Sequence, residues 1–139
     1  MIDAGGGDGR IKTLLEEARK IAVVGLSPRP ERPSHRVAAY LISRGYDVIP
    51  VNPGHDELLG RTCYPSLEAV SGKIDIVNIF RRSEQVAPIV DQAVEAGAGA
   101  VWMQLGIVDE AAATRAELSG ITVVMDRCIK VDHSRLFGG

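Results

Sequence analysis

Basic side chains follow the predicted strands of this chain, at positions where they could hold a phosphate-bearing ligand. Seven of them occupy such positions: Arg29, Arg32, Arg36, Arg81, Arg82, Arg127 and Lys130. In an open α/β sheet, ligands bind beyond the carboxyl ends of the strands, where arginine forks and helix N-termini receive anionic groups. The pattern therefore predicts an anion-binding rim, although any single arginine could serve only to solvate a loop.

The turn after the first predicted strand narrows the choice of ligand. Residues 21–26 are apolar and run into the position at which a first βα turn carries nucleotide phosphates. Gly25 suits a tight turn there, but it stands alone, so the G-x-G-x-x-G pattern of dinucleotide binding is absent. The next strand ends at Asn52 and Pro53, with no carboxylate to accept a ribose hydroxyl. Both absences count against NAD and favour another phosphate-bearing ligand.

The elements that must position these residues alternate between strand and helix. Apolar segments predict five strands, at residues 21–26, 46–51, 74–80, 100–105 and 121–125. Helical spacing predicts helices at 10–20, 34–44, 83–96 and 109–119, with a short turn at 66–70 and a polar tail at 126–139. This alternation indicates an α/β fold, a Rossmann-like doubly wound five-stranded parallel sheet in three αβα layers. Right-handed crossovers favour the strand order 3-2-1-4-5, numbered along the chain.

Composition limits the classes of protein and partner. The net charge of −2 argues against nucleic-acid binding, which needs a strongly basic face. No apolar run approaches the ~20 residues of a membrane span, and two scattered cysteines without a secretory signal favour the reducing cytoplasm. Residues 1–9 contain four glycines and two aspartates, which predicts a flexible leader. Residues 10–139 are then expected to form a single domain.

Residues with catalytic or metal-binding chemistry form no convincing group. The three histidines fall in separate loops without metal-ligand spacing: His35, His55 and His133. Cys63 and Cys128 do not form a CxxC pair. Cys128 stands close to two basic residues and is a candidate reactive thiol, with an inert structural cysteine as the alternative.

Several segments, taken in order, resemble one known family. They read GLSP…RPS from Gly25, GYDVIPVNP from Gly45, FR at Phe80, WMQLG from Trp102 and VVMDRC from Val123. This series resembles the small bacterial and archaeal CoA-binding proteins, single-domain relatives of the CoA-binding domain in the α subunit of succinyl-CoA synthetase. The resemblance extends over residues 10 to 137, and the order of the segments makes it specific.

The resemblance implies a Rossmann-like domain that binds coenzyme A, or an acyl-CoA, at the carboxyl ends of the strands. The site residues that it implies are Gly25, Ser27 and Pro28 around the nucleotide, Arg29, Arg32, Ser34 and Arg36 near its phosphates, Asn52 and Pro53 beside the adenosine, Phe80 and Arg81 flanking the ligand, and Gln104 along the pantetheine arm. A carboxylate after the second strand would repel the 3′-phosphate of CoA, so its absence there also agrees with the resemblance. The synthetase's second domain, with its phosphorylated histidine, has no counterpart in this sequence, so the resemblance implies binding without that reaction.

Four functions remain open from the sequence. The first is a non-catalytic module that binds CoA or an acyl-CoA as a sensor, carrier or subunit. The second is an NAD(P)-binding redox sensor or small oxidoreductase, since one fold hosts both. The third is an enzyme that uses the CoA thiol through Cys128, and the fourth is an interaction protein with a vestigial site. The expected partner is a small nucleotide ligand, and the alanines at 111–113 suit either a homodimer or protein contact or internal packing.

Overall fold

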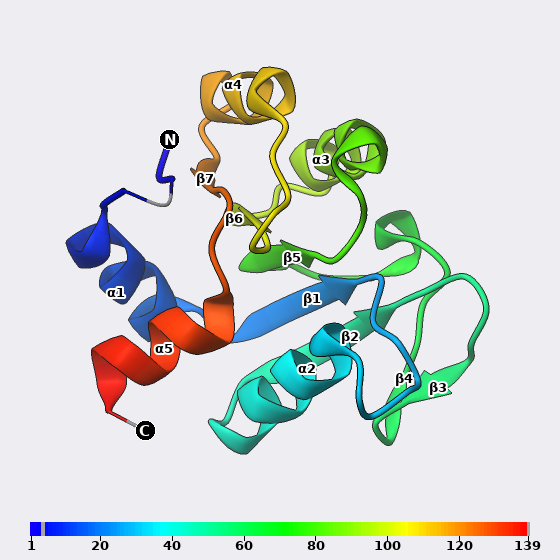
Figure 1. The fold of residues 1–139 in the computed structure, drawn as a ribbon. Coiled ribbons are helices and arrows are strands. Elements are labelled where there is room, and N and C mark those ends of the chain that lie inside the picture. The colour runs from blue at the N-terminus through cyan, green and yellow to red at the C-terminus, as the bar shows by residue number, and fades with distance from the viewer. Residues whose placement is uncertain (4, 139) are drawn as a thin grey trace.

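A five-stranded parallel sheet forms the centre of the protein in a computed structural model that describes residues 1–3 and 5–138. Its strands are β1 (Lys20–Val24), β2 (Asp47–Val51), β5 (Ile76–Ile79), β6 (Ala100–Met103) and β7 (Thr122–Val124). Figure 1 shows the sheet between two layers of helices. The predicted α/β fold with a five-stranded parallel sheet in three layers is therefore confirmed.

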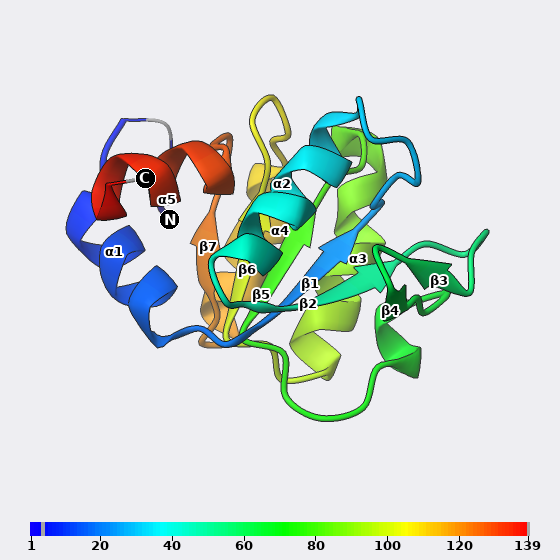
Figure 2. The same ribbon diagram turned by 90° about the horizontal axis from the view of Figure 1, so that it is seen from below.

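The helices divide between the two faces of the sheet (Figures 1 and 2). One face carries α1 (Asp8–Glu17), α2 (Pro33–Ser43) and α5 (Ile129–Phe137), and the other carries α3 (Val86–Glu95) and α4 (Glu110–Leu118). Shorter elements are the 3-10 turns η1 (Leu67–Ala69) and η2 (Ser83–Gln85) and the hairpin of β3 (Glu57–Leu58) and β4 (Arg61–Thr62). Each face buries its own aliphatic cluster. In the described part of the chain, no helix has the length and apolar character needed to cross a membrane.

The order of the strands differs from the prediction. The sheet runs β2-β1-β5-β6-β7, so the third strand along the chain lies beside the first, and the predicted order 3-2-1-4-5 is wrong. Two physical features agree with the observed order. Pro50 in β2 lacks an N–H and suits an edge strand, whereas β5 is buried along its whole length, as a central strand must be. The winding of the sheet therefore reverses between β1 and β5, not between the first and fourth strands.

Among the described residues, an isolated bridge lies at each edge of the sheet. On β7, Ile2 forms a parallel bridge with Val124 and is only 3% exposed. On β2, Val51 forms a parallel bridge with Tyr64. Ile2 lies within the predicted flexible leader, and α1 begins at Asp8, also inside it. The domain boundary at residue 10 stays a prediction, but Ile2 belongs to the buried core.

The prediction of a polar tail at residues 126–139 is wrong over most of this range, because residues 129–137 form α5. Ile129, Leu136 and Phe137 pack against the core. The remaining inner positions are polar, since Asp132 and His133 are 4% and 5% exposed. Buried polar residues in place of apolar ones hide the helical pattern from the sequence.

His133 of α5 lies among aromatic rings and contacts Tyr40 of α2. Its Nδ1 lies 2.8 Å from the Tyr40 hydroxyl, and its ring stacks on Phe137 with centroids 4.6 Å apart. Burial, together with the nearby Arg44 cation, lowers the pKa of His133 below its ordinary value of 6.5. Folding therefore favours the neutral imidazole.

This burial predicts a dependence of stability on pH. Because folding lowers the pKa of His133, the unfolded chain binds a proton at a higher pH than the folded chain. The contribution is complete above pH 6.5 and is lost as the pH falls from 6.5 toward the folded pKa. We expect His133→Gln to reduce the loss of unfolding free energy between about pH 7.5 and about pH 5.5, measured by urea denaturation. An unchanged pH dependence in the variant would show that His133 protonates freely in the folded state.

Candidate functional site

Two adjoining grooves lie at the carboxyl edge of the sheet. The first groove, of about 450 Å³, is lined by Gly25, Ser27, Arg29, Arg32, Pro33, Ser34 and Phe80. The second groove, of about 410 Å³, shares Pro33 and Phe80 and adds Arg36, Val37, Gln104, Leu105, Ile107, Cys128 and Lys130. The shared residues make the two grooves one continuous surface across the ends of β1, β5 and β6.

The loop between β1 and α2 is held in shape by its own hydroxyl groups. The Ser27 N–H donates to Ser34 Oγ at 2.9 Å, and the Arg29 N–H donates to Ser27 Oγ at 3.1 Å. The Ser27 carbonyl lies 2.9 Å from His35 Nδ1. Neither serine hydroxyl donates to another described residue, so both retain an O–H for a ligand.

A glycine is required at position 25, because the backbone just after β5 passes very close to it. Its φ is +89°, and a Cβ atom at this position would lie 2.3 Å from the carbonyl oxygen of Phe80. Its N–H donates to the Val51 carbonyl at 2.9 Å. A side chain is therefore excluded by protein backbone, and the close approach of a phosphate is not needed to explain the glycine.

Asn52 ties the turn after β2 to the turn after β1. Its Nδ2 donates to the Leu26 carbonyl at 2.9 Å, and its Oδ1 accepts from the Gly54 N–H at 3.1 Å. The side chain lines neither groove. Pro53 and Arg81 share a separate pocket of about 170 Å³, which has no lining residue in common with either groove.

Eight of the twelve predicted site residues line the two grooves. The other four are Asn52, Pro53 and Arg81, described above, and Pro28, which is exposed in the loop between Ser27 and Arg29. The structure thus brings most of the predicted residues together on one surface. Their contact with a ligand stays a prediction.

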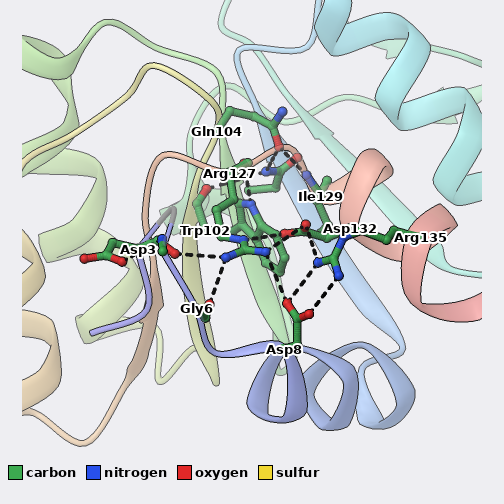
Figure 3. Close-up of polar contacts among 11 residues, drawn as sticks. Asp3, Gly6, Asp8, Trp102, Gln104, Arg127, Ile129, Asp132 and Arg135 are labelled. Carbon is green, nitrogen blue, oxygen red and sulfur yellow. Dashed lines mark hydrogen bonds and ion pairs between the residues drawn. The ribbon is translucent and has the colours of Figure 1, made fainter.

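Gln104 joins the sheet to the start of α5. It is 5% exposed, and its Oε1 accepts from Asn78 Nδ2 at 3.1 Å and from the Ile129 N–H at 3.0 Å. Figure 3 shows its amide nitrogen directed away from these contacts. Asn78 Oδ1 is buried without a partner among the described residues. Gln104 therefore bridges two elements with its oxygen and keeps its nitrogen for the second groove, which it lines.

Arg127 does not belong to the anion-binding rim that the sequence predicts. Its Nε donates to Asp132 Oδ2 at 2.7 Å, and its Nη1 donates to the carbonyls of Asp3 and Gly6 at 3.0 and 2.8 Å (Figure 3). Pairing with Asp132 raises the pKa of Arg127 above its ordinary value. The guanidinium is turned toward α1 and the N-terminal residues, so it is not free to hold an anion in either groove.

The sequence patterns did not predict the apolar lining of the second groove. Val37, Leu105 and Ile107 supply it. Leu105 is the second residue after β6 and is 69% exposed, and a large apolar residue near a strand end was the available signal. Cys128, the candidate reactive thiol, is half-buried in this groove as the N-cap residue of α5.

Comparison with known proteins identifies the family. Residues 19–134, which contain all of both grooves, match the model of the CoA binding domain. The chain is 48% identical over 124 residues to the uncharacterized protein YneT of Bacillus subtilis, covering 89% of this chain and 92% of YneT. A hypothetical protein from Pyrococcus horikoshii superposes with a TM-score of 0.93 at 41% identity, over 96% of this chain and 94% of that structure.

A larger enzyme contains a related domain. The dinucleotide-forming acetyl-coenzyme A synthetase 1 of Ca. Korarchaeum cryptofilum superposes with a TM-score of 0.68 at 29% identity. The match covers 77% of this chain but only 25% of the synthetase. The resemblance read from the sequence is thus confirmed, and the chain belongs to the CoA binding domain family.

Proposed function

We propose that the protein binds coenzyme A or an acyl-CoA across the two grooves, as a binding, sensor or carrier module. One observation carries the proposal: four basic side chains and no carboxylate line this surface at the point where the sheet winding reverses. Ligands of open α/β sheets bind at that point. In a member of the CoA binding domain family, CoA is the anionic ligand that this surface fits.

In this proposal the first groove holds the diphosphate. Arg29 and Arg32 supply charge, and Ser27 and Ser34 supply free hydroxyl donors. The helix α2 begins at Pro33, on the groove wall, so the positive end of its dipole adds to the same field. The smaller pocket of Pro53 and Arg81 takes the adenosine side.

The pantetheine arm then extends along the second groove. Its methylene and dimethyl groups suit the apolar surface of Val37, Phe80 and Leu105. The free amide nitrogen of Gln104 can donate to one of the amide carbonyls of the arm. The thiol, or the acyl group that it carries, would lie toward Cys128 at the start of α5.

A titration of nucleotide-free protein with CoA, acetyl-CoA, NAD, NADH, NADP and NADPH tests this function. A ligand that binds only the folded state raises the melting temperature. We expect a rise with the two CoA species alone, with calorimetry giving the affinities. A rise with nicotinamide cofactors alone would overturn the proposal and make an NAD(P)-binding sensor or oxidoreductase the function.

Arg32→Ala is expected to weaken CoA binding by about 10- to 150-fold. A hydrogen bond to a charged group is worth roughly 1.5–3 kcal/mol, and each 1.4 kcal/mol is tenfold in affinity. Because Arg32 is exposed, the melting temperature without ligand should change little. The matched control is Arg115→Ala on α4, which lies on the other face of the sheet and should bind CoA normally. Equal CoA affinity in both variants would remove the first groove as the phosphate site.

A further inference from the structure

An aromatic cluster joins α5 to the helices beside it, and His133 lies at its centre. The His133 ring stacks on Phe137 of the same helix. The rings of Tyr40 and Tyr46 meet it edge-on, with centroids 5.5 and 5.7 Å away. Tyr40 belongs to α2, and the Tyr46 hydroxyl donates to the Leu15 carbonyl of α1 at 2.6 Å. One buried imidazole therefore links α5 to α2 directly and to α1 through Tyr46. The contact of Tyr40 with His133 is called the α2–α5 seam below.

Positive charges lie against the rings of this cluster. Lys130 Nζ and Arg44 Cζ lie 5.6 and 6.0 Å from the centre of the Tyr40 ring. On the α1 side, Lys12 Nζ lies 6.0 Å from the centre of the Phe137 ring. None of these cations forms an ion pair with a described carboxylate. A proton on the imidazole would therefore add one more cation to an uncompensated group.

The carboxylates of the neighbouring helices are engaged elsewhere or exposed. Asp132 of α5 accepts from Arg127 at 2.7 Å and from Arg135 at 3.0 Å. Asp8 of α1 pairs with the same two arginines. There is no Asp or Glu in α2. The other carboxylates of α1 are exposed and form no ion pair among the described residues: Glu16 and Glu17. The α2–α5 seam thus offers no described counter-ion to an imidazolium, in agreement with the lowered pKa of His133.

The helix α5 is bound to its two neighbours in different ways. To α1 it is bound by the ion pair of Arg135 with Asp8 at 2.8 Å, in which His133 has no part. To α2 it is bound through the Tyr40 hydroxyl, 2.8 Å from His133 Nδ1. Within the described residues of α5, Ile129 is the only apolar side chain that is fully buried. Segments with few buried apolar contacts open locally at a lower free energy than that of global unfolding.

The second groove takes its lining from both sides of the α2–α5 seam. Arg36 and Val37 come from α2, and Cys128 and Lys130 come from the start of α5. A separation of the two helices would therefore change the shape of this groove.

We propose that protonation of His133 separates α5 from α2 and opens the second groove, which makes the α2–α5 seam an acid-sensitive element of the fold. The neutral imidazole shares a hydrogen bond with Tyr40 inside the cluster. The imidazolium would lie buried beside Arg44 and Lys130 without a described counter-ion, and exposure to water relieves this repulsion. The contacts of α5 with α1 do not involve the imidazole and are retained.

Hydrogen exchange of backbone amides, followed by NMR without any ligand, tests this opening. After correction for intrinsic rates, we expect the protection of residues 129–137 to fall about three- to tenfold between about pH 7.5 and about pH 5.5, because the second pH lies below the ordinary pKa of 6.5. Low concentrations of urea should change this exchange little, since a local opening exposes little surface. Unchanged protection, or exchange of α5 and β5 amides at one common urea-sensitive rate, would contradict a local opening.

Variants assign the response to one residue. In His133→Gln the protection of α5 should be the same at both pH values. The matched control is His55→Gln, a change at an exposed histidine after β2, which should keep the full fall. Arg44→Gln, at an exposed position, removes one cation beside the cluster and should reduce the fall. A full fall in His133→Gln, or in Arg44→Gln should the first variant not fold, would overturn the inference.

The link between the α2–α5 seam and the second groove has its own readout, and this part rests on the proposed function. A ligand that binds only the closed groove disfavours the opening, so CoA at roughly ten times its dissociation constant should raise the protection of α5 about tenfold. If calorimetry shows that CoA binds and the protection of α5 does not rise, the opening leaves the groove intact and this part is wrong. If no CoA species binds, the proposed function fails, while exchange without ligand still tests the seam.

Discussion

Asp132→Ala is expected to lower the free energy of unfolding by roughly 3 kcal/mol. Asp132 and Arg127 form an ion pair of 2.7 Å whose side chains are only 6% and 11% exposed. Removing one partner of a buried pair typically costs 3–5 kcal/mol, because an uncompensated charge is left behind. The value lies at the low end, since Arg127 keeps the Asp8 carboxylate at 3.4 Å and the carbonyls of Asp3 and Gly6.

The comparison variant is Asp91→Ala. Asp91 pairs with Arg115 at 3.3 Å, but these side chains are 58% and 48% exposed. Exposed pairs contribute about 0–1 kcal/mol, so urea denaturation should separate the two variants clearly. Similar small losses in both would show that the network around Arg127 contributes little to stability.

Gly25→Ala should destabilise the protein by about 2–5 kcal/mol. A left-handed backbone costs an L-residue roughly 1–2 kcal/mol, and Gly25 has a φ of +89°. The new Cβ would also lie 2.3 Å from the Phe80 carbonyl oxygen, an overlap that backbone shifts must relieve at roughly 1–3 kcal/mol. Because Phe80 lines both grooves, the same shift should weaken the proposed binding of CoA.

Gly45→Ala separates the two causes. Gly45 has a φ of +93°, but a Cβ atom there would meet nothing within 4 Å. This variant should lose only the roughly 1–2 kcal/mol of the left-handed conformation. An equal loss in the two variants, measured by urea denaturation, would contradict the close approach of the β5 end to Gly25.

The fold class was predictable because each strand is a compact apolar run bounded by turn residues. The strand order was harder to predict, because right-handed crossovers allow both arrangements. One local feature of the sequence does indicate the order. Pro50 has no N–H to donate to a neighbouring strand, so its strand is expected at an edge of the sheet. The strand that contains it, β2, is an edge strand.

The candidate site was predictable in position but not in every side chain. Residues just after parallel strands share one edge of the sheet, so most of the predicted residues meet there. Arg127 follows a strand as well, but its direction is set by Asp8 and Asp132, from two different helices. Asp8 and Arg127 are 119 residues apart in the sequence, so their pairing depends on the packed fold and no local sequence pattern predicts it.

The bridges at Ile2 and Tyr64 bear on how copies of this protein can associate. A bare edge strand offers its N–H and C=O groups to any strand that approaches, which is a common route to aggregation. Here Ile2 occupies such groups at one end of β7, and Tyr64 occupies them at one end of β2. Lateral growth of the sheet into a second molecule would first have to displace these residues. Strand-to-strand polymerisation is thereby hindered at both edges, and contacts between helical surfaces remain the easier route to assembly.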